Sequence, residues 1–201
     1  MREHNADRAG SLLVTTAVIL LFASVPIGIF LVTFIHQSFY LKKTYLFFDT
    51  PMSSYVTMVA MFLIISVLLI FIAIYLFKSY ESKRRSMILA LSTLITIVIT
   101  IIGGFLSLDN YFYMDKEGLY YDDLWGMEKT VYAWDEITAM KQINKKENGT
   151  LTPEKVIFTY GDDKIELPLT PKLRNEIDPV IGFIENSKGV KLVLETRTQE
   201  E

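Results

Sequence analysis

The chain changes character across residues 86–120, which read SMILALSTLITIVITIIGGFLSLDNYFYMDKEGLY. Up to Leu108 this stretch holds no charged side chain, and from Asp109 onward charged and aromatic residues alternate with turn residues. Residues 1–108 hold eight Lys/Arg and four Asp/Glu, a net charge of +4, whereas residues 109–201 hold twelve and nineteen, a net charge of −7. This contrast predicts a transmembrane region over 1–108, a soluble domain over 109–196 and a tail at 197–201.

The same division excludes several classes of protein. A soluble protein with one core and a disordered chain are both excluded, because long apolar segments fill the first half. The soluble half is acidic and would repel phosphates, so we expect no nucleic-acid partner.

Three segments without Asp, Glu, Lys or Arg carry the membrane prediction: 12–35, 55–77 and 86–108. A helix of about 20 residues spans the hydrocarbon core of a bilayer, so each segment is long enough to cross. The first segment has a signal peptide as its alternative. Its apolar run is longer than that of a signal peptide, however, and no Ala-x-Ala-like cleavage site follows Ile35.

Basic residues set the expected orientation. The loop after the second segment holds the main basic cluster: Lys78, Lys83, Arg84 and Arg85. With this loop and the amino-terminal tail in the cytoplasm, six basic residues lie inside, against three or four in the opposite placement. The positive-inside rule therefore predicts a multi-pass protein of the cell membrane with a cytoplasmic N-terminus and an extracytoplasmic C-terminal domain. Binding of anionic lipid is a second interpretation of residues 83–85, although their role in topology is sufficient to explain them.

Two further features concern the membrane half. No ionisable side chain lies within the three segments, which is evidence against a stand-alone pump or transporter. The first loop, from Phe39 to Tyr55, is rich in aromatic residues, so we expect it to lie on the membrane surface.

The soluble half has the pattern of short strands followed by one helix. Strands are predicted near 109–114, 118–124, 129–134, 137–144, 155–160 and 164–169, with a longer loop at 145–154. Thr170 and Pro171 are typical of a helix start, and apolar spacing predicts a helix over 171–187, followed by a possible strand at 190–194. The predicted class is α+β: three transmembrane helices, then an antiparallel β-barrel or curved sheet capped by one C-terminal helix.

Three segments resemble a bacterial pleckstrin-homology-like (PH-like) domain attached to transmembrane helices. They are the Tyr-Met-Asp-x-x-Gly-Leu-Tyr stretch at 113–120, the Tyr-Ala-Trp-Asp-Glu-Ile stretch at 132–137 and the closing helix at 171–187. The resemblance implies a binding or scaffold module rather than a catalyst. Some small membrane proteins with such a domain protect bacteria from peptide antibiotics, so it also implies a peptide-immunity type of role.

The sequence offers no catalytic group, cofactor site or metal site. The chain has no Cys, and its two His residues, His4 and His36, do not lie at ligand spacing. The adjacent acids at 135–136 and 162–163 are typical of solvated turns. Trp134 is expected in the core together with Ile177 and Ile181, with a ligand platform as the alternative for Trp134.

Counting strand directions predicts a polarised domain. The 124–129 link returns to the membrane side, so we expect Leu124, Trp125 and Met127 to contact the headgroup layer. The acidic turns at 115–117, 135–136 and 161–163 then lie at the opposite end, open to a cationic partner. Packing of Trp125 in the core is an equal alternative.

These observations lead to one functional expectation and one alternative. We expect a non-enzymatic integral membrane protein that presents a PH-like module to a protein or peptide partner at the membrane surface. The alternative is an accessory subunit of a membrane transporter or export complex, and a membrane enzyme is the weakest hypothesis.

Overall fold

The computed structural model describes residues 2–78, 83–121, 130–147 and 150–198. Contacts divide the chain into two compact units. The first unit comprises Met1–Tyr40 and Thr50–Asn110, and the second comprises Leu41–Asp49 and Tyr111–Glu201. The chain therefore passes between the units three times, because residues 41–49, placed by the sequence in the transmembrane region, belong to the second unit.

The first unit consists of three long helices: α1 (Arg2–Ile35), α2 (Met52–Phe77) and α3 (Lys83–Asp109). A π-helical turn, His36–Tyr40, extends α1. All three helices are long and apolar enough to cross a bilayer, which is compatible with a multi-pass membrane protein and with the three predicted spans.

Two glycines allow these helices to approach one another closely. A Cβ at Gly28 would lie 2.8 Å from the Val59 side chain of α2, and one at Gly103 would lie 2.4 Å from the sulfur of Met61. Small residues at such positions are the usual means of close packing in membranes. Gly104, by contrast, faces no atom within 4 Å.

The second unit contains two four-stranded sheets. The first sheet has the order β1 (Phe47–Asp49), β2 (Phe112–Met114), β3 (Gly118–Tyr121) and β4 (Thr130–Ala133), all antiparallel. The second has the order β7 (Asp163–Pro168), β6 (Thr150–Tyr160), β5 (Ile137–Glu147) and β8 (Leu192–Thr198). Strand β8 pairs in parallel with β5, and the other neighbours in this sheet are antiparallel.

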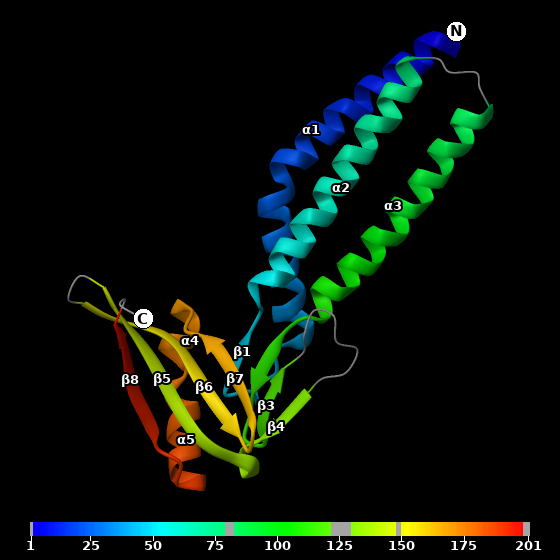
Figure 1. The fold of residues 1–201 in the computed structure, drawn as a ribbon. Coiled ribbons are helices and arrows are strands. Elements are labelled where there is room, and N and C mark those ends of the chain that lie inside the picture. Colours follow the sequence, from blue (N-terminus) through cyan, green and yellow to red (C-terminus); the bar gives the residue numbers. More distant parts are fainter. Residues whose placement is uncertain (1, 79–82, 122–129, 148–149, 199–201) are drawn as a thin grey trace. The chain divides into compact units, whose positions relative to one another are not determined.

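Two helices follow β7, α4 (Pro171–Glu176) and α5 (Asp178–Lys188), and Figure 1 shows both along one face of the second sheet. The Thr170 hydroxyl caps α4 by accepting the Leu173 N–H, as the sequence predicted. Gly189, with φ of 70°, ends α5 in the left-handed conformation.

One hydrophobic core serves both sheets and both helices. Its buried members come from six of the strands, both helices, the turn at 134–136 and two connecting positions: Phe47, Phe112, Met114, Leu119, Trp134, Ile137, Met140, Val156, Phe158, Tyr160, Leu167, Leu169, Leu173, Ile177, Val180, Ile181 and Ile184. Burial of this apolar area is the main favourable contribution to folding of the unit.

The structure corrects four expectations of the sequence. The described strands form two separate sheets rather than a barrel, and one pairing is parallel. The C-terminal helix is interrupted after Glu176, because Pro179 in the next turn cannot donate a backbone hydrogen bond. The predicted 145–154 loop is mostly strand, since β5 runs to Glu147 and β6 starts at Thr150. Finally, the aromatic first loop contributes β1 to a sheet, which its sequence did not indicate.

Candidate functional site

The three predicted core residues lie in the core of the second unit. Trp134 is 1% exposed, in a short 3-10 turn between β4 and β5, and Ile177 and Ile181 are buried members of the same cluster. The Trp134 Nε1–H donates to the Asp115 carbonyl at 2.8 Å, and its ring centroid lies 5.8 Å from that of Phe158. A side chain enclosed in this way offers no face to a ligand.

The other predicted site residues lie at the ends of helices or outside the described residues. Lys78 is exposed at the C-cap of α2, and the remaining basic residues form the first turn of α3: Lys83, Arg84 and Arg85. The predicted membrane-contact residues lie outside the described part of the chain: Leu124, Trp125 and Met127. Their contact with lipid therefore stays a prediction.

The acidic turns lie together at one end of the second unit, and the position of this end relative to the membrane stays a prediction. The Trp134 N–H donates to the Glu117 carbonyl, which joins the 115–117 turn to the 134–136 turn. Ile137 pairs with Tyr160, which places the 161–163 turn beside them. The cluster is partly neutralised, because the Lys188 ammonium forms an ion pair with Asp135.

Three tyrosines form a continuous stack on the face of the first sheet that points away from the core. The rings of Tyr45 and Tyr113 are 4.0 Å apart, and those of Tyr113 and Tyr120 are 4.5 Å apart, both nearly parallel. All three side chains are partly exposed. We call Tyr45, Tyr113 and Tyr120 the tyrosine stack.

Carboxylates border the tyrosine stack at the β2–β3 turn. The Tyr120 hydroxyl donates to Glu117 at 3.2 Å. Asp115 accepts the Glu117 and Gly118 N–H groups through its side chain and so shapes the turn. Burial first, and then the negative charge of Asp115, raises the pKa of Tyr120; burial and the neighbouring tyrosines raise that of Tyr113. The Tyr113 and Tyr120 phenols therefore stay neutral at physiological pH.

Lys172 adds contacts between α4 and strand β1, which is already paired with β2. The Lys172 ammonium at the start of α4 donates to the Phe48 carbonyl, lies 3.6 Å from the Asp49 carboxylate and sits 5.6 Å from the centre of the Phe47 ring. This combination of ion pair and cation–π contact joins the loop between two membrane helices to the C-terminal helices.

Polar side chains join the ends of the three helices in the first unit. The two ring nitrogens of His36 lie 2.6 Å from the Thr50 hydroxyl and 2.8 Å from the Leu108 carbonyl. The Ser54 hydroxyl donates to the Asn110 carbonyl, and the Ser107 hydroxyl donates to the Ser54 carbonyl. These bonds are structural, because those to the Leu108 and Asn110 carbonyls satisfy acceptors at the carboxyl end of α3 that have no partner within the helix.

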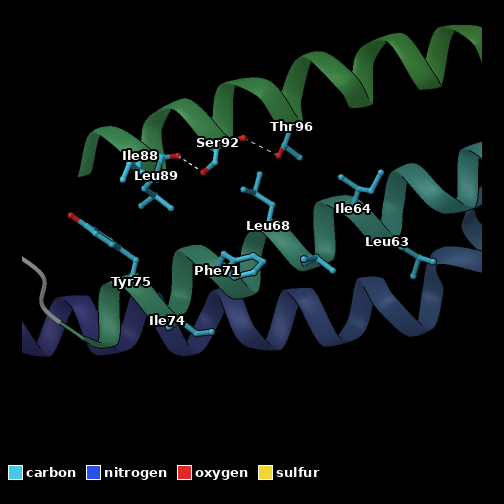
Figure 2. A pocket seen from close by; sticks show the side chains of 11 residues that line it. Leu63, Ile64, Leu68, Phe71, Ile74, Tyr75, Ile88, Leu89, Ser92 and Thr96 are labelled. Atoms are coloured by element: carbon cyan, nitrogen blue, oxygen red, sulfur yellow. Dashed lines mark hydrogen bonds between the residues drawn. The ribbon is translucent and has the colours of Figure 1, made fainter. Parts of the chain in front are cut away.

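An apolar groove of about 660 Å³ separates α2 from α3 (Figure 2). Most of its lining is aliphatic or aromatic, from Leu63 to Tyr75 on α2 and from Ile88 to Thr96 on α3. Its hydroxyls belong to Tyr75 on α2 and to Ser92 and Thr96 on α3. The two on α3 bond within their own helix: Ser92 donates to the Leu89 carbonyl and Thr96 to the Ser92 carbonyl, each at 2.9 Å. The groove therefore suits hydrocarbon rather than a polar ligand.

Among the described residues, no group of three or more His, Cys, Asp or Glu side chains could hold a metal ion. Comparisons with known protein families, with curated proteins and with solved structures find no match for this chain.

Sequence reasoning missed the tyrosine stack, the Lys172 contact and the groove. Alternation at Tyr111, Tyr113 and Tyr120 could have indicated an aromatic face, because side chains two apart on a strand share a side. Tyr45 and Lys172 gave no local signal, since their partners lie far away in the sequence.

Proposed function

We propose that the chain is an integral membrane protein whose second unit is a non-enzymatic, PH-like binding module at the membrane surface, and that this module binds a cationic segment of a peptide or protein. Two sheets joined at the Trp134 turn and covered by C-terminal helices are compatible with the PH-like assignment. The three apolar helices are the membrane anchor of the proposal.

The observation that carries the proposal is the tyrosine stack with Glu117 at its edge. Tyrosine ring faces attract Lys and Arg side chains, and a neighbouring carboxylate adds a direct charge interaction. Tyr120 lies at one end of the stack, so one of its ring faces is not covered by Tyr113, and the 3.2 Å bond between Tyr120 and Glu117 holds the carboxylate beside it. Partly exposed aromatic side chains of this kind are enriched in binding surfaces.

The origin of β1 supports a location at the membrane. Tyr45 belongs to the loop between α1 and α2, so one member of the tyrosine stack comes from a segment that connects two helices of the proposed anchor. The first sheet is incomplete without β1, which this loop contains. The chain therefore connects the second unit to the helical unit at three points.

Binding of a defined cationic peptide to the full chain in mild detergent tests the proposal. We expect a fluorescently labelled oligo-arginine peptide to bind, measured by anisotropy, with an affinity that falls as salt is raised to about 0.15 M. Glu117→Gln and Tyr120→Leu should each weaken binding about threefold or more. Asp162→Asn is the matched control, because it removes one exposed acid from another turn of the same end.

Three outcomes would overturn this function. If Asp162→Asn weakens binding as much as Glu117→Gln, the peptide responds only to overall charge and the tyrosine stack is not a site. If the chain copurifies from native membranes in fixed stoichiometry with a polytopic transporter and binds no peptide, it is an accessory subunit. Hydrolytic activity in the purified protein would support an enzyme instead.

A further inference from the structure

The groove between α2 and α3 is confined to one half of these helices. In the other half the helices are in contact: the Met61 side chain of α2 packs against Gly103 of α3, and the Ser107 hydroxyl donates to the Ser54 carbonyl. Over Leu63–Tyr75 they are separated by the 660 Å³ groove. The pair is therefore closed near the end of α3 and open near its beginning, where residues 78–85 connect the helices.

The length of the groove matches one leaflet of a bilayer. From Leu63 to Tyr75 a helix rises about 18 Å at 1.5 Å per residue. Half of a hydrocarbon core of about 30 Å is about 15 Å. The groove thus spans the depth of the acyl chains in one leaflet, namely the leaflet next to residues 78–85.

The lining selects hydrocarbon, and the adjacent segment selects a negative headgroup. The Ser92 and Thr96 hydroxyls already donate to carbonyls of their own helix, so a hydrocarbon chain beside them leaves neither group unpaired. Residues 78–85 hold Lys78, Lys83, Arg84 and Arg85 against Glu81 alone, a net charge of +3. Basic residues next to a membrane helix attract anionic lipids.

We propose that the groove binds one anionic phospholipid, with an acyl chain between α2 and α3 and its headgroup at the level where α3 begins, a stretch whose sequence is basic. This site is independent of the cationic ligand proposed for the second unit. The lipid would fill the gap beside α3, none of whose most apolar stretch is buried within the protein.

Native mass spectrometry of the full chain, released from detergent after exposure to equimolar phosphatidylglycerol and phosphatidylcholine, tests this site. We expect one phosphatidylglycerol to be retained per chain, with a preference of about tenfold over phosphatidylcholine. Ser92→Trp places a large ring in the groove and should abolish this retention. Leu91→Trp is the matched control, because Leu91 is 57% exposed and does not line the groove.

A charge variant separates the headgroup from the acyl chain. Arg84→Gln combined with Arg85→Gln should remove the preference for phosphatidylglycerol, whereas Lys42→Gln combined with Lys43→Gln, two charges in the other loop, should leave it unchanged. Unfolding temperatures of all variants show whether each chain is intact.

Three results would overturn the proposal. The first is equal retention of both lipids by the unaltered chain, and the second is retention that survives Ser92→Trp. The third is a dimer or complex that forms disulfide cross-links through the introduced thiol of a Leu68→Cys variant. The last result would show that a helix, from a second copy or a partner, occupies the groove.

Discussion

Trp134 connects three parts of the second unit through a single side chain. Its indole N–H bonds the β2–β3 turn, its ring packs on Phe158 of β6, and it lies in the cluster formed by α4 and α5. Trp134→Ala should lower the free energy of unfolding of this unit by about 3–5 kcal/mol, as for other large buried aromatics. Chemical denaturation of the full chain, followed by hydrogen exchange of the second unit, measures the loss.

A matched variant separates packing from hydrogen bonding at this position. Trp134→Phe keeps an aromatic ring but leaves the Asp115 carbonyl without its donor, so it should cost less than the alanine variant. A loss below about 1 kcal/mol for Trp134→Ala would contradict the core position.

At Tyr160 we expect a substitution to stabilise the protein, because the Tyr160 hydroxyl lowers the free energy of unfolding. The phenol oxygen is buried and has no hydrogen-bond partner among the described residues. Tyr160→Phe should therefore raise the free energy of unfolding by about 1 kcal/mol, since an unpaired buried hydroxyl is removed while the ring stays. Thermal unfolding checks this, and a clear loss of stability would show that the hydroxyl is in fact bonded.

The same residue predicts a weakening at alkaline pH. Burial, followed by the neighbouring Tyr132, raises the pKa of Tyr160 above its ordinary value of about 10. The unfolded chain therefore loses this proton first, so the stability contribution is complete below pH about 10 and is lost as pH rises through the folded pKa. In Tyr160→Phe, the decline of the unfolding midpoint above pH about 10 should be shallower.

At the scale of the element, β1 shows where sequence reasoning succeeds and where it stops. The three apolar helices, the positions of β2 to β7 along the chain and the start of the C-terminal helix depend on local periodicity and capping, and the sequence predicted them closely. Strand β1 has three residues, too few for a periodic signal, and it forms only because β2, more than sixty residues later, pairs with Phe47–Asp49. Long-range pairing of this kind also decides the tyrosine stack, which explains why neither was predicted.

The contribution of β1 gives a prediction about fragments. A fragment of residues 111–201 lacks Phe47, which is 2% exposed in the core, and leaves an edge of β2 unpaired. We expect this fragment to be unstable and prone to aggregation. Joining residues 41–49 to it through a flexible Gly/Ser linker should restore a folded protein, as judged by dispersed amide resonances.

A control keeps the length of the fragment and removes the core contact. The linked fragment with Phe47→Ala should be less stable by about 3–5 kcal/mol. A fragment of 111–201 that folds equally well without residues 41–49 would contradict the role of β1.

At the scale of the whole molecule, the proposed membrane protein has two alternative orientations, which differ in the side of the membrane that the second unit faces. The loops between the three apolar helices differ in charge. The basic residues of 78–85 favour the orientation in which that segment is cytoplasmic. In that orientation the second unit, with its tyrosine stack, faces the outside, and the lipid groove opens into the cytoplasmic leaflet, where anionic lipids are concentrated in many membranes. Both proposals thus depend on one topology for their biological setting, although neither binding test does.

Site-specific proteolysis decides this topology. We expect a protease recognition sequence inserted between Glu147 and Thr150, at the end of the β5–β6 hairpin, to be cut in intact cells. The same sequence placed after Lys78 should be cut only after the membrane is permeabilised, because the positive-inside rule holds the 78–85 segment in the cytoplasm. Arg84→Gln combined with Arg85→Gln should lower the fraction of chains in this orientation, since it removes two of the six basic residues assigned to the cytoplasm. Cleavage after Lys78 but not at the hairpin in intact cells would show that the second unit is cytoplasmic, so that any peptide bound by the tyrosine stack must come from inside the cell.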